Sequence, residues 1–298
     1  MAITLTQIRA FLAVRRTGSV HAAAGQLLIS QPSVSAAVAA LSSELDTALF
    51  ERHGRGVRLT PAGEAFAPYA AEVLGLVEQG RNAAQEAGHP ERSKIRLVAV
   101  NTAGEYLVPP LIQAYRQQHP EVSILLEVGN RATVFERLET RRADIGIGGR
   151  PPGRRLIGYP FVGNDLLVVA GQTPADLAHT PWLLREEGSG TRLATERLLA
   201  DLGMSERGDS TPELLTLGSN GAVKQGLAIG LGVTLISRFA VTRELREGAL
   251  TEISLPGTPL NRPWHVLFPQ ASLIRPAARA FGEFLRSEPC RKIIENLL

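Results

Sequence analysis

Hydroxyl, amide and guanidinium groups are concentrated in two stretches of the first sixty residues. The first stretch consists of small and polar residues, Ser30, Gln31, Pro32, Ser33, Ser35 and Ala36. The second carries Arg52, Arg55 and Arg58 around two glycines. Short polar side chains on a helix can hydrogen-bond DNA base edges, and an alanine methyl can contact a thymine methyl. Guanidinium groups bind phosphates, so these two stretches are the predicted DNA contacts.

Both stretches also have a plainer interpretation. Ser33 and Ser35 could serve only to start a helix, because hydroxyl side chains bind the free amide groups of a first turn. The three arginines could lie on a solvated hairpin and bind nothing. The sequence leaves both alternatives open.

A third stretch with chemical potential is residues 185–192, Arg-Glu-Glu-Gly-Ser-Gly-Thr-Arg. It follows an apolar run typical of a strand and precedes a helical pattern. Free amides at a helix start, with the hydroxyls of Ser189 and Thr191, suit an anion, and Arg192 could add positive charge. An ordinary capped junction between strand and helix is the alternative.

The residue types needed for catalysis or metal binding do not come together in the sequence. Six histidines are scattered without metal-ligand spacing, and no Gly-x-Ser-x-Gly motif occurs. Residues 146–149 lack the glycine pattern of a dinucleotide loop. The single cysteine, Cys290, is expected to be a packed thiol rather than a redox sensor. We therefore predict no catalytic residue, no metal site, no cofactor and no enzymatic activity.

Composition and charge agree with a protein that binds nucleic acid. The chain has 298 residues and a net charge of +3, and residues 1–60 hold six arginines against three acidic residues. The surplus of positive charge therefore lies in the N-terminal block, where it would attract phosphates. No run approaches the roughly 20 apolar residues that span a bilayer, and no export signal is evident. We expect a cytoplasmic protein with no membrane partner.

The elements that position the N-terminal groups are three helices and a hairpin. Helices are expected over residues 6–16, 20–27 and from Ser30 onward, with Thr17-Gly18 ending the first and Ser19 capping the second. In the third, Val34, Val38, Leu41 and Leu45 form the buried face. Ser33, Ala36, Ala37 and Ala40 point outward. Residues 50–60 predict a two-stranded basic wing. This is an all-α winged helix-turn-helix, whose surface fits the major groove.

A long helix is predicted from Thr60-Pro61 to residue 87, with apolar and small residues at spacings of three and four. A solitary helix of this length has nothing of its own to cover its apolar stripe. Pairing with a second copy of the chain is therefore expected. Packing onto its own chain is the alternative.

From residue 94 onward the pattern alternates between apolar strands and amphipathic helices. Continuous apolar runs at 95–100, 122–128, 145–147 and 166–170 are typical of strands buried on both faces. Helices are expected near 108–118, 134–142, 192–202, 222–229 and 276–286. This indicates an α/β domain large enough for two lobes and a cleft.

The N-terminal block resembles the LysR-type transcriptional regulators. The matching residues include Phe11, Val14, Gly18-Ser19, Ala22-Ala23, Leu27, Ser30 to Ser35, Leu41, Leu45, Leu49-Phe50, Arg52, Arg55-Gly56, Leu59-Thr60 and Ala62-Gly63. The likeness continues through Pro109, Leu111, His119-Pro120, Val122 and residues 143–147, so it covers essentially the whole chain. It implies a winged helix-turn-helix, a dimerising linker helix and a two-lobed effector domain like periplasmic binding proteins. It also implies homodimers that commonly pair into homotetramers on promoter DNA, with RNA polymerase as a candidate partner.

Within that family, the effector half resembles the subgroup of carbon-fixation and sulfur- and nitrogen-assimilation regulators. The resemblance implies an effector cleft between the lobes and favours a small anionic effector. The residues it assigns to the cleft are Asn101, Thr102, Ala103, Gly188, Ser189, Gly190, Thr191 and Asn220. Gly221 departs from the subgroup, where an acidic residue is common, which leaves the ligand's identity open.

The recognition helix also departs from the family, because Ala36 and Ala37 stand where arginine or glutamine is common and Ser42 where glutamate is. We therefore expect recognition to depend on Gln31, Ser33 and Ser35, on the wing and on DNA shape.

These observations predict three segments and a function. They are a DNA-binding domain at 1–60, a linker helix and hinge at 61–92, and an effector domain at 93–298. Lobe I would cover about 93–165 and 267–298, and lobe II about 166–266. The function expected is regulation of transcription, as activator or repressor, in response to an effector that changes oligomer geometry on DNA. The rival is an enzyme or transport-type binding protein on the same cleft, which would leave residues 1–60 unexplained.

Overall fold

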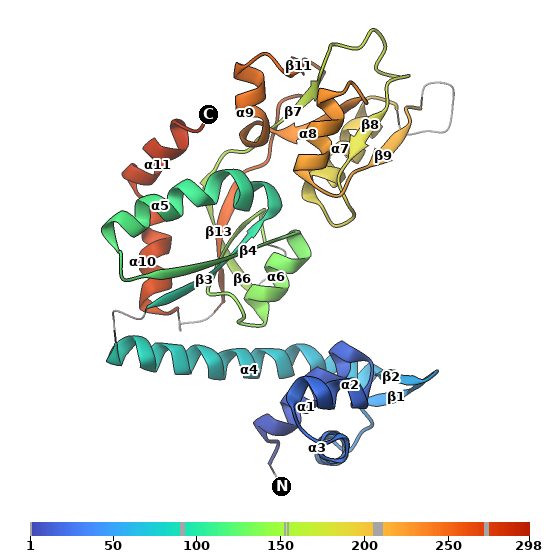
Figure 1. Cartoon of the computed structure of the whole chain (residues 1–298), viewed down its shortest axis with the longest axis vertical. Helices are drawn as coiled ribbons and strands as arrows, with labels where there is room; N and C mark the ends of the chain where they lie inside the picture. Colours follow the sequence, from blue (N-terminus) through green and yellow to red (C-terminus); the bar gives the residue numbers. More distant parts are fainter. Residues whose placement is uncertain (1, 90–92, 152, 154, 205–210, 271–273) are drawn as a thin grey trace. The chain divides into compact units, whose positions relative to one another are not determined.

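The computed structural model describes residues 2–89, 93–151, 153, 155–204, 211–270 and 274–298. The chain divides into two compact units (Figure 1). The first comprises Met1–Gln85 with Thr140–Arg142, and the second comprises Glu86–Glu139 with Ala143–Leu298. Each unit has its own hydrophobic core.

The first unit consists of three short helices, a hairpin and a long helix. Its elements are α1 (Leu5–Thr17), α2 (Val20–Leu27), α3 (Gln31–Glu44), β1 (Phe50–His53), β2 (Gly56–Leu59) and α4 (Pro61–Gly88). Serine hydroxyls start two of the helices, because Ser19 accepts from Ala22 N–H and Ser30 accepts from Ser33 N–H. Thr4 and Gln7 cap α1 reciprocally.

The hairpin is held against the end of α1. Gly18 ends that helix with a φ of 64°, and its carbonyl accepts a hydrogen bond of 2.9 Å from Val57 N–H. A Cβ at Gly56 would lie 2.5 Å from the same carbonyl, so only glycine allows this approach. Behind the hairpin, the Phe11 ring packs 5.3 Å from the rings of Phe50 and Phe66. The wing is thereby fixed to the helical core.

The second unit contains two lobes, each built on its own sheet. In lobe I the strand order is β4-β3-β5-β13-β6. Its elements are β3 (Lys94–Val100), the π-helix η2 (Ala103–Leu107), α5 (Val108–Gln118), β4 (Ser123–Gly129), α6 (Arg131–Glu139), β5 (Ile145–Gly148), β6 (Leu156–Val162), β13 (Trp264–Pro269), α10 (Pro276–Leu285) and α11 (Glu288–Glu295). Strands β3, β4 and β5 are parallel, and β13 runs antiparallel to β5 and β6.

In lobe II the strand order is β11-β7-β10-β8-β9, with β12 also pairing with β7. Its elements are β7 (Asp165–Ala170), β8 (Trp182–Leu184), α7 (Gly190–Asp201), β9 (Leu214–Thr216), α8 (Asn220–Ala228), β10 (Val233–Ser237), α9 (Arg238–Arg246), β11 (Thr251–Ile253) and β12 (Leu260–Asn261). Side chains alternate along β7, so Leu166 and Val168 pack with the core beneath α7 while Leu167 and Val169 pack with the core beneath α8 and α9. The strand is therefore apolar on both faces, as its continuous hydrophobic run predicted.

The structure corrects several details of the sequence-based expectations. Ala37, expected to point outward, is half-buried against the helical core, because it follows Val34 by three residues on the same face. Helix α6 occupies 131–139 rather than 134–142, since Asn130 caps its first turn and Arg141 has a positive φ of 58°. Strand β13 pairs with lobe I from Trp264 onward, although the predicted boundary extended lobe II to 266.

Among the described residues, no single helix is long and apolar enough to cross a membrane. Helices α2 and α3 meet that requirement only when taken together, and they are bent by 109° relative to each other.

Candidate functional site

The start of α3 presents the polar residues that the sequence singled out. Ser30, Gln31, Pro32, Ser33, Ser35 and Ala36 are all exposed. The Ser30 hydroxyl lies 2.7 Å from the Ser33 hydroxyl and accepts from Ser33 N–H, so these two serines do form the helix cap. Within the described chain, no hydrogen bond engages the side chains of Gln31 and Ser35. These two side chains can accept or donate to another molecule without breaking a bond.

The three arginines of the wing are exposed but not equivalent. Arg52 lies on β1, and Arg55 lies in the turn between the strands. Arg58 lies on β2, and its Nε is 2.6 Å from Glu51 Oε1 on the neighbouring strand. A phosphate would therefore compete with Glu51 for Arg58, whereas Arg55 has no such competitor among the described residues.

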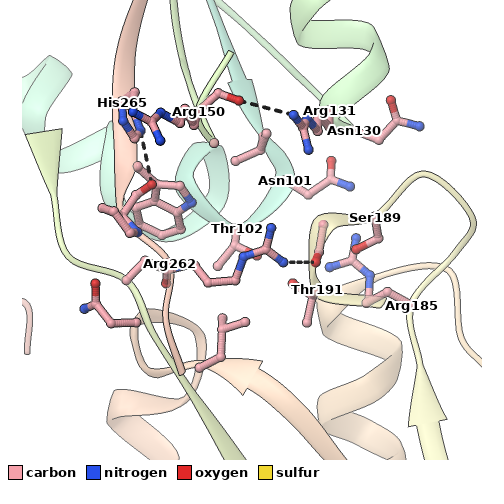
Figure 2. Close-up of a pocket in the computed structure, with 18 residues that line it drawn as sticks. Asn101, Thr102, Asn130, Arg131, Arg150, Arg185, Ser189, Thr191, Arg262 and His265 are labelled. Carbon is pink, nitrogen blue, oxygen red and sulfur yellow. Dashed lines mark hydrogen bonds between the residues drawn. The ribbon is translucent and has the colours of Figure 1, made fainter. Parts of the chain in front are cut away.

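A cavity of about 470 Å³ lies between the two lobes of the second unit. This volume suits a small metabolite. Asn101, Thr102, Ser189, Gly190 and Thr191, all predicted from the sequence, line it. Figure 2 shows Asn101 and Thr102 arriving from the end of β3, and Ser189 and Thr191 from the start of α7.

The remaining predicted cleft residues lie elsewhere. Ala103 is fully buried in the core of lobe I and does not line the cavity. Gly188 lines a neighbouring groove, where its φ of 81° shapes the turn before α7. Arg192, expected to add charge, lies in that same groove, with its Nε 2.8 Å from Glu196 Oε1.

Asn220 is buried and joins the two lobes rather than lining the cavity. Its Nδ2 donates to Glu105 Oε2 at 2.8 Å and to Thr102 Oγ1 at 3.3 Å, both in lobe I. Its Oδ1 accepts from Arg185 of lobe II. A parallel bridge runs from Asn101 Nδ2 to Glu186 Oε1 at 3.1 Å. Sequence reasoning missed Glu105 and Glu186, which hold these bridges.

The start of α7 offers free amide groups to the cavity. Its N-cap residue, Ser189, makes no side-chain hydrogen bond to the first turn. The amides of Gly190 and Thr191 therefore have no intrahelical acceptor, and both residues line the cavity. The helix dipole adds to the positive potential at this point.

Among the described residues, four arginines line the cavity, and sequence reasoning singled out none of them as effector contacts. They are Arg131, Arg150, Arg185 and Arg262. Arg185 is paired with Glu186 at 2.8 Å, but no described carboxylate pairs with the other three, and no acidic residue lines the cavity. Burial, followed by repulsion from Arg197 and Arg131, lowers the pKa of Arg262. The cavity thus carries uncompensated positive charge.

His265 lies at the edge of this positive cluster (Figure 2). Burial lowers its pKa, the hydrogen bond to the Pro263 carbonyl opposes that change, and the charge of Arg150 adds to it. No group of three or more histidine, cysteine or acidic side chains within the described chain is arranged to hold a metal ion. The arginines and the free amides at the start of α7 can bind an anion.

Two family models together cover most of the chain. Residues 5–64 match "Bacterial regulatory helix-turn-helix protein, lysR family", and residues 88–289 match "LysR substrate binding domain". A RuBisCO operon transcriptional regulator from Acidithiobacillus ferrooxidans is 32% identical over 95% of this chain and 93% of its own length.

Solved structures show the same fold. The CcmR regulatory domain from Synechocystis PCC6803, in complex with 2-PG, is 27% identical with a TM-score of 0.59, covering 65% of this chain and 96% of that one. CbnR, a LysR family transcriptional regulator, has a TM-score of 0.68 at 20% identity, covering 95% of this chain and 98% of that one. The predicted fold class is confirmed. The chain therefore belongs to the LysR family of transcriptional regulators.

Proposed function

We propose that a small anionic effector binds in the cavity between the lobes and controls the binding of promoter DNA. The observation that carries this proposal is the composition of the cavity wall, whose described residues include four arginines and no acidic residue. Free amides at the start of α7 add hydrogen-bond donors on the same wall. The complex of the similar CcmR domain with 2-PG supports a metabolite as the ligand.

An effector in this position would act on the equilibrium between lobe arrangements. Asn101 and Thr102 belong to lobe I, whereas Ser189 and Thr191 belong to lobe II. A ligand that binds both sets at once stabilises the arrangement in which they face each other. The bridges made by Asn220 and Glu186 already favour one arrangement, so the effector would strengthen or replace them.

A second copy of the chain is the proposed partner of α4. Tyr69, Val73 and Val77 lie at intervals of four residues on this helix and are 62%, 40% and 44% exposed. An apolar stripe of this kind is typical of a helix that pairs with another. Light scattering on the Val73→Glu variant should show a smaller assembly than wild type. We further propose homotetramers in the cytoplasm, with RNA polymerase as an additional partner.

On DNA, Gln31, Ser33 and Ser35 are the proposed base contacts, and Ala36 the proposed contact to a thymine methyl. Arg52, Arg55 and Arg58 would bind phosphates or the minor groove from the wing. The small side chains of α3 leave much of the recognition to DNA shape. Replacing Ser33 with tryptophan should abolish operator binding. Unchanged operator binding by this variant would contradict the assignment.

The proposed function can be tested by a gel shift with DNA from the promoter region beside the protein's own gene. A gel shift should occur at low salt, and an anion that raises the unfolding temperature should alter the shift. A protein that shifts no such DNA, or whose shift is indifferent to every stabilising anion, would contradict the proposal. The first result would revive an enzyme or transport role for the cleft.

A further inference from the structure

Arg185 lines the cavity, but all three nitrogens of its guanidinium already donate hydrogen bonds within the protein. Figure 2 shows Arg185 on the same side of the cavity as Ser189 and Thr191. Its Nε donates to Glu186 Oε2 at 2.8 Å and its Nη2 donates to Glu186 Oε1 at 2.9 Å, the two-bond geometry in which arginine holds a carboxylate. Its Nη1 donates to Asn220 Oδ1. An effector anion can receive both bonds from Nε and Nη2 only if the Glu186 carboxylate leaves.

The Glu186 carboxylate also occupies a donor on the opposite lobe. Its Oε1 accepts from Asn101 Nδ2 at 3.1 Å, and Asn101 lines the cavity after the end of β3. One carboxylate of the chain therefore holds a guanidinium of lobe II and an amide of lobe I at the same time. Arg185 and Asn101 line the cavity and Glu186 does not, so these donors serve a partner outside the cavity wall.

The Glu186 carboxylate can leave this network without a change in the backbone. Its side chain is 28% exposed, whereas that of Arg185 is 5% exposed. Glu186 lies in the turn between β8 and α7, where its carbonyl accepts from Ser189 N–H at 3.2 Å. The backbone is held by this turn while the side chain can rotate to water. Arg185 is fixed by burial and needs an anionic partner, because an unpaired guanidinium is costly away from water.

We infer that Glu186 is a tethered competitor of the effector, whose anion displaces the Glu186 carboxylate from Arg185 and Asn101. This inference rests on the proposed function, because it describes how the same cavity is regulated. Displacement breaks the Asn101–Glu186 bridge between the lobes and leaves the bridge from Asn220 to Thr102 in place. Effector binding is thereby coupled to a contact between the lobes, and the strength of the Glu186 contacts sets the effector concentration that is needed.

The test is a calorimetric titration of the full-length protein with sodium sulfate at neutral pH and constant ionic strength. Glu186→Gln should bind sulfate more than about tenfold more tightly than wild type, because an amide competes for Arg185 much less strongly than a carboxylate does. Glutamine keeps the size of the side chain and one hydrogen bond to Arg185, which preserves the local packing. Thr191→Met should lose the binding, which separates sulfate in the cavity from sulfate on the arginines of the DNA-binding domain.

Glu187→Gln is the matched control, because it removes the same charge at the next residue. Glu187 is exposed and lines the neighbouring groove, and among the described contacts it binds neither Arg185 nor Asn101. Its sulfate affinity should stay within about threefold of wild type, since an exposed charge is screened by salt. Glu186→Asp keeps the charge on a shorter side chain that cannot hold Arg185 and Asn101 together. It should show an intermediate gain, which keeps the inference testable if Glu186→Gln fails to fold.

The inference is overturned if the Glu186 variants bind sulfate no more tightly than wild type, or more weakly, because Glu186 then only holds Arg185 in position. An equal gain in Glu187→Gln would also overturn it, since overall charge would then explain the effect. In both cases the proposed function stands if wild type binds sulfate and Thr191→Met does not. If neither wild type nor any Glu186 variant binds sulfate, the inference fails, and the gel shift with other anions decides the proposed function separately.

Discussion

At the scale of single residues, Thr191 is the side chain whose loss should separate effector binding from DNA binding. It lies at the second position of α7 and lines the cavity. Thr191→Val keeps the shape but removes a hydroxyl donor to an anion, which should weaken anion binding by about tenfold or more. Calorimetry with the anion that most raises the unfolding temperature measures this loss. A larger residue at 191 should abolish the response altogether, and operator affinity without effector should stay unchanged.

Thr195→Val is the matched control, because Thr195 lies one turn later on the same helix and bonds the Thr191 carbonyl rather than lining the cavity. Equal losses in the two variants would show that Thr191 acts through helix stability and not through the ligand.

The arginines of the wing should differ in their contribution to DNA affinity. Arg55→Gln should weaken binding to all sequences and reduce the salt slope by about one, because one phosphate contact is lost. Arg58→Gln should have a smaller effect, since Arg58 must leave Glu51 to reach a phosphate. Anisotropy titrations at several salt concentrations measure both slopes. An unchanged salt slope for Arg55→Gln would mean that Arg55 does not contact the DNA phosphate backbone.

Leu28 is a residue whose backbone conformation does not suit it. It ends α2 with a φ of 55° and is 91% exposed, so it gains little packing in return. The left-handed conformation costs a leucine roughly 1–2 kcal/mol, and asparagine tolerates it better. Leu28→Asn should therefore stabilise the protein by about 1 kcal/mol in urea unfolding. A loss of stability would mean that the exposed side chain makes contacts elsewhere.

The sequence indicated some residues of the cleft and not others for physical reasons. Ser189, Gly190 and Thr191 form one continuous stretch, so their local pattern was sufficient. Arg131, Arg150 and Arg262 belong to three separate stretches and share no motif. Their positions in the sequence could have identified two of them. Arg131 and Arg150 follow the carboxyl ends of β4 and β5, and ligands commonly bind at this edge of parallel strands.

At the scale of elements, a buried ion network joins the last turn of α4 to lobe I. Arg275 is 6% exposed, and its Nη1 lies 3.1 Å from Glu86 Oε2. Its Nη2 lies 2.5 Å from Asp144 Oδ2, while Arg96 Nη2 lies 2.9 Å from Asp144 Oδ1. Glu86 also accepts from the Ala277 amide at the start of α10. The network therefore fixes Glu86, Arg96, Asp144 and Arg275, all residues of the second unit, to each other.

Asp144→Asn should destabilise the protein by about 3 kcal/mol, since it leaves Arg275 and Arg96 without their shared carboxylate. Burial alone would raise the pKa of Asp144, but hydrogen bonds and charges from Arg96 and Arg275 outweigh it and lower the pKa. Because the pKa of Asp144 is lower in the folded protein, its carboxylate stabilises the fold at pH values above its unfolded pKa of about 3.9. This stabilisation is lost as the pH falls through the folded pKa.

Urea unfolding of wild type and Asp144→Asn between pH 7 and pH 3 tests this. The difference in free energy of unfolding should be full at pH 7 and shrink below about pH 4. A difference that stays constant down to pH 3 would contradict the assignment.

The elements themselves were largely predictable, and the exceptions have identifiable causes. Helix α5 has the predicted bounds of 108–118, because its apolar spacing and its prolines in the first turn are local signals. The π-helix at Ala103–Leu107 was not predicted, since Ala103, Gly104 and Leu107 are buried by tertiary packing and no local pattern marks the segment. Helix α11 was also missed, although Ser287 caps it, because its apolar face is short.

At the scale of the whole molecule, the central claim is that anion binding between the lobes changes how the regulator holds DNA. This requires two separable parts in one chain, a basic winged helix-turn-helix and a cavity that binds an anion. The helix-turn-helix domain and the substrate-binding domain both match models of the LysR family. The effector can shift the equilibrium between the two lobe arrangements only by the difference between its binding free energies for them.

The most direct measurement is the bend angle of the promoter DNA beside the protein's own gene, followed by energy transfer between dyes at its ends. The probe is the anion that most raises the unfolding temperature, and saturating amounts of it should change the energy transfer for wild type. The same probe should leave it unchanged for a variant with methionine in place of Thr191. Identical transfer with and without the bound probe, in wild-type protein shown by calorimetry to be saturated, would contradict the account.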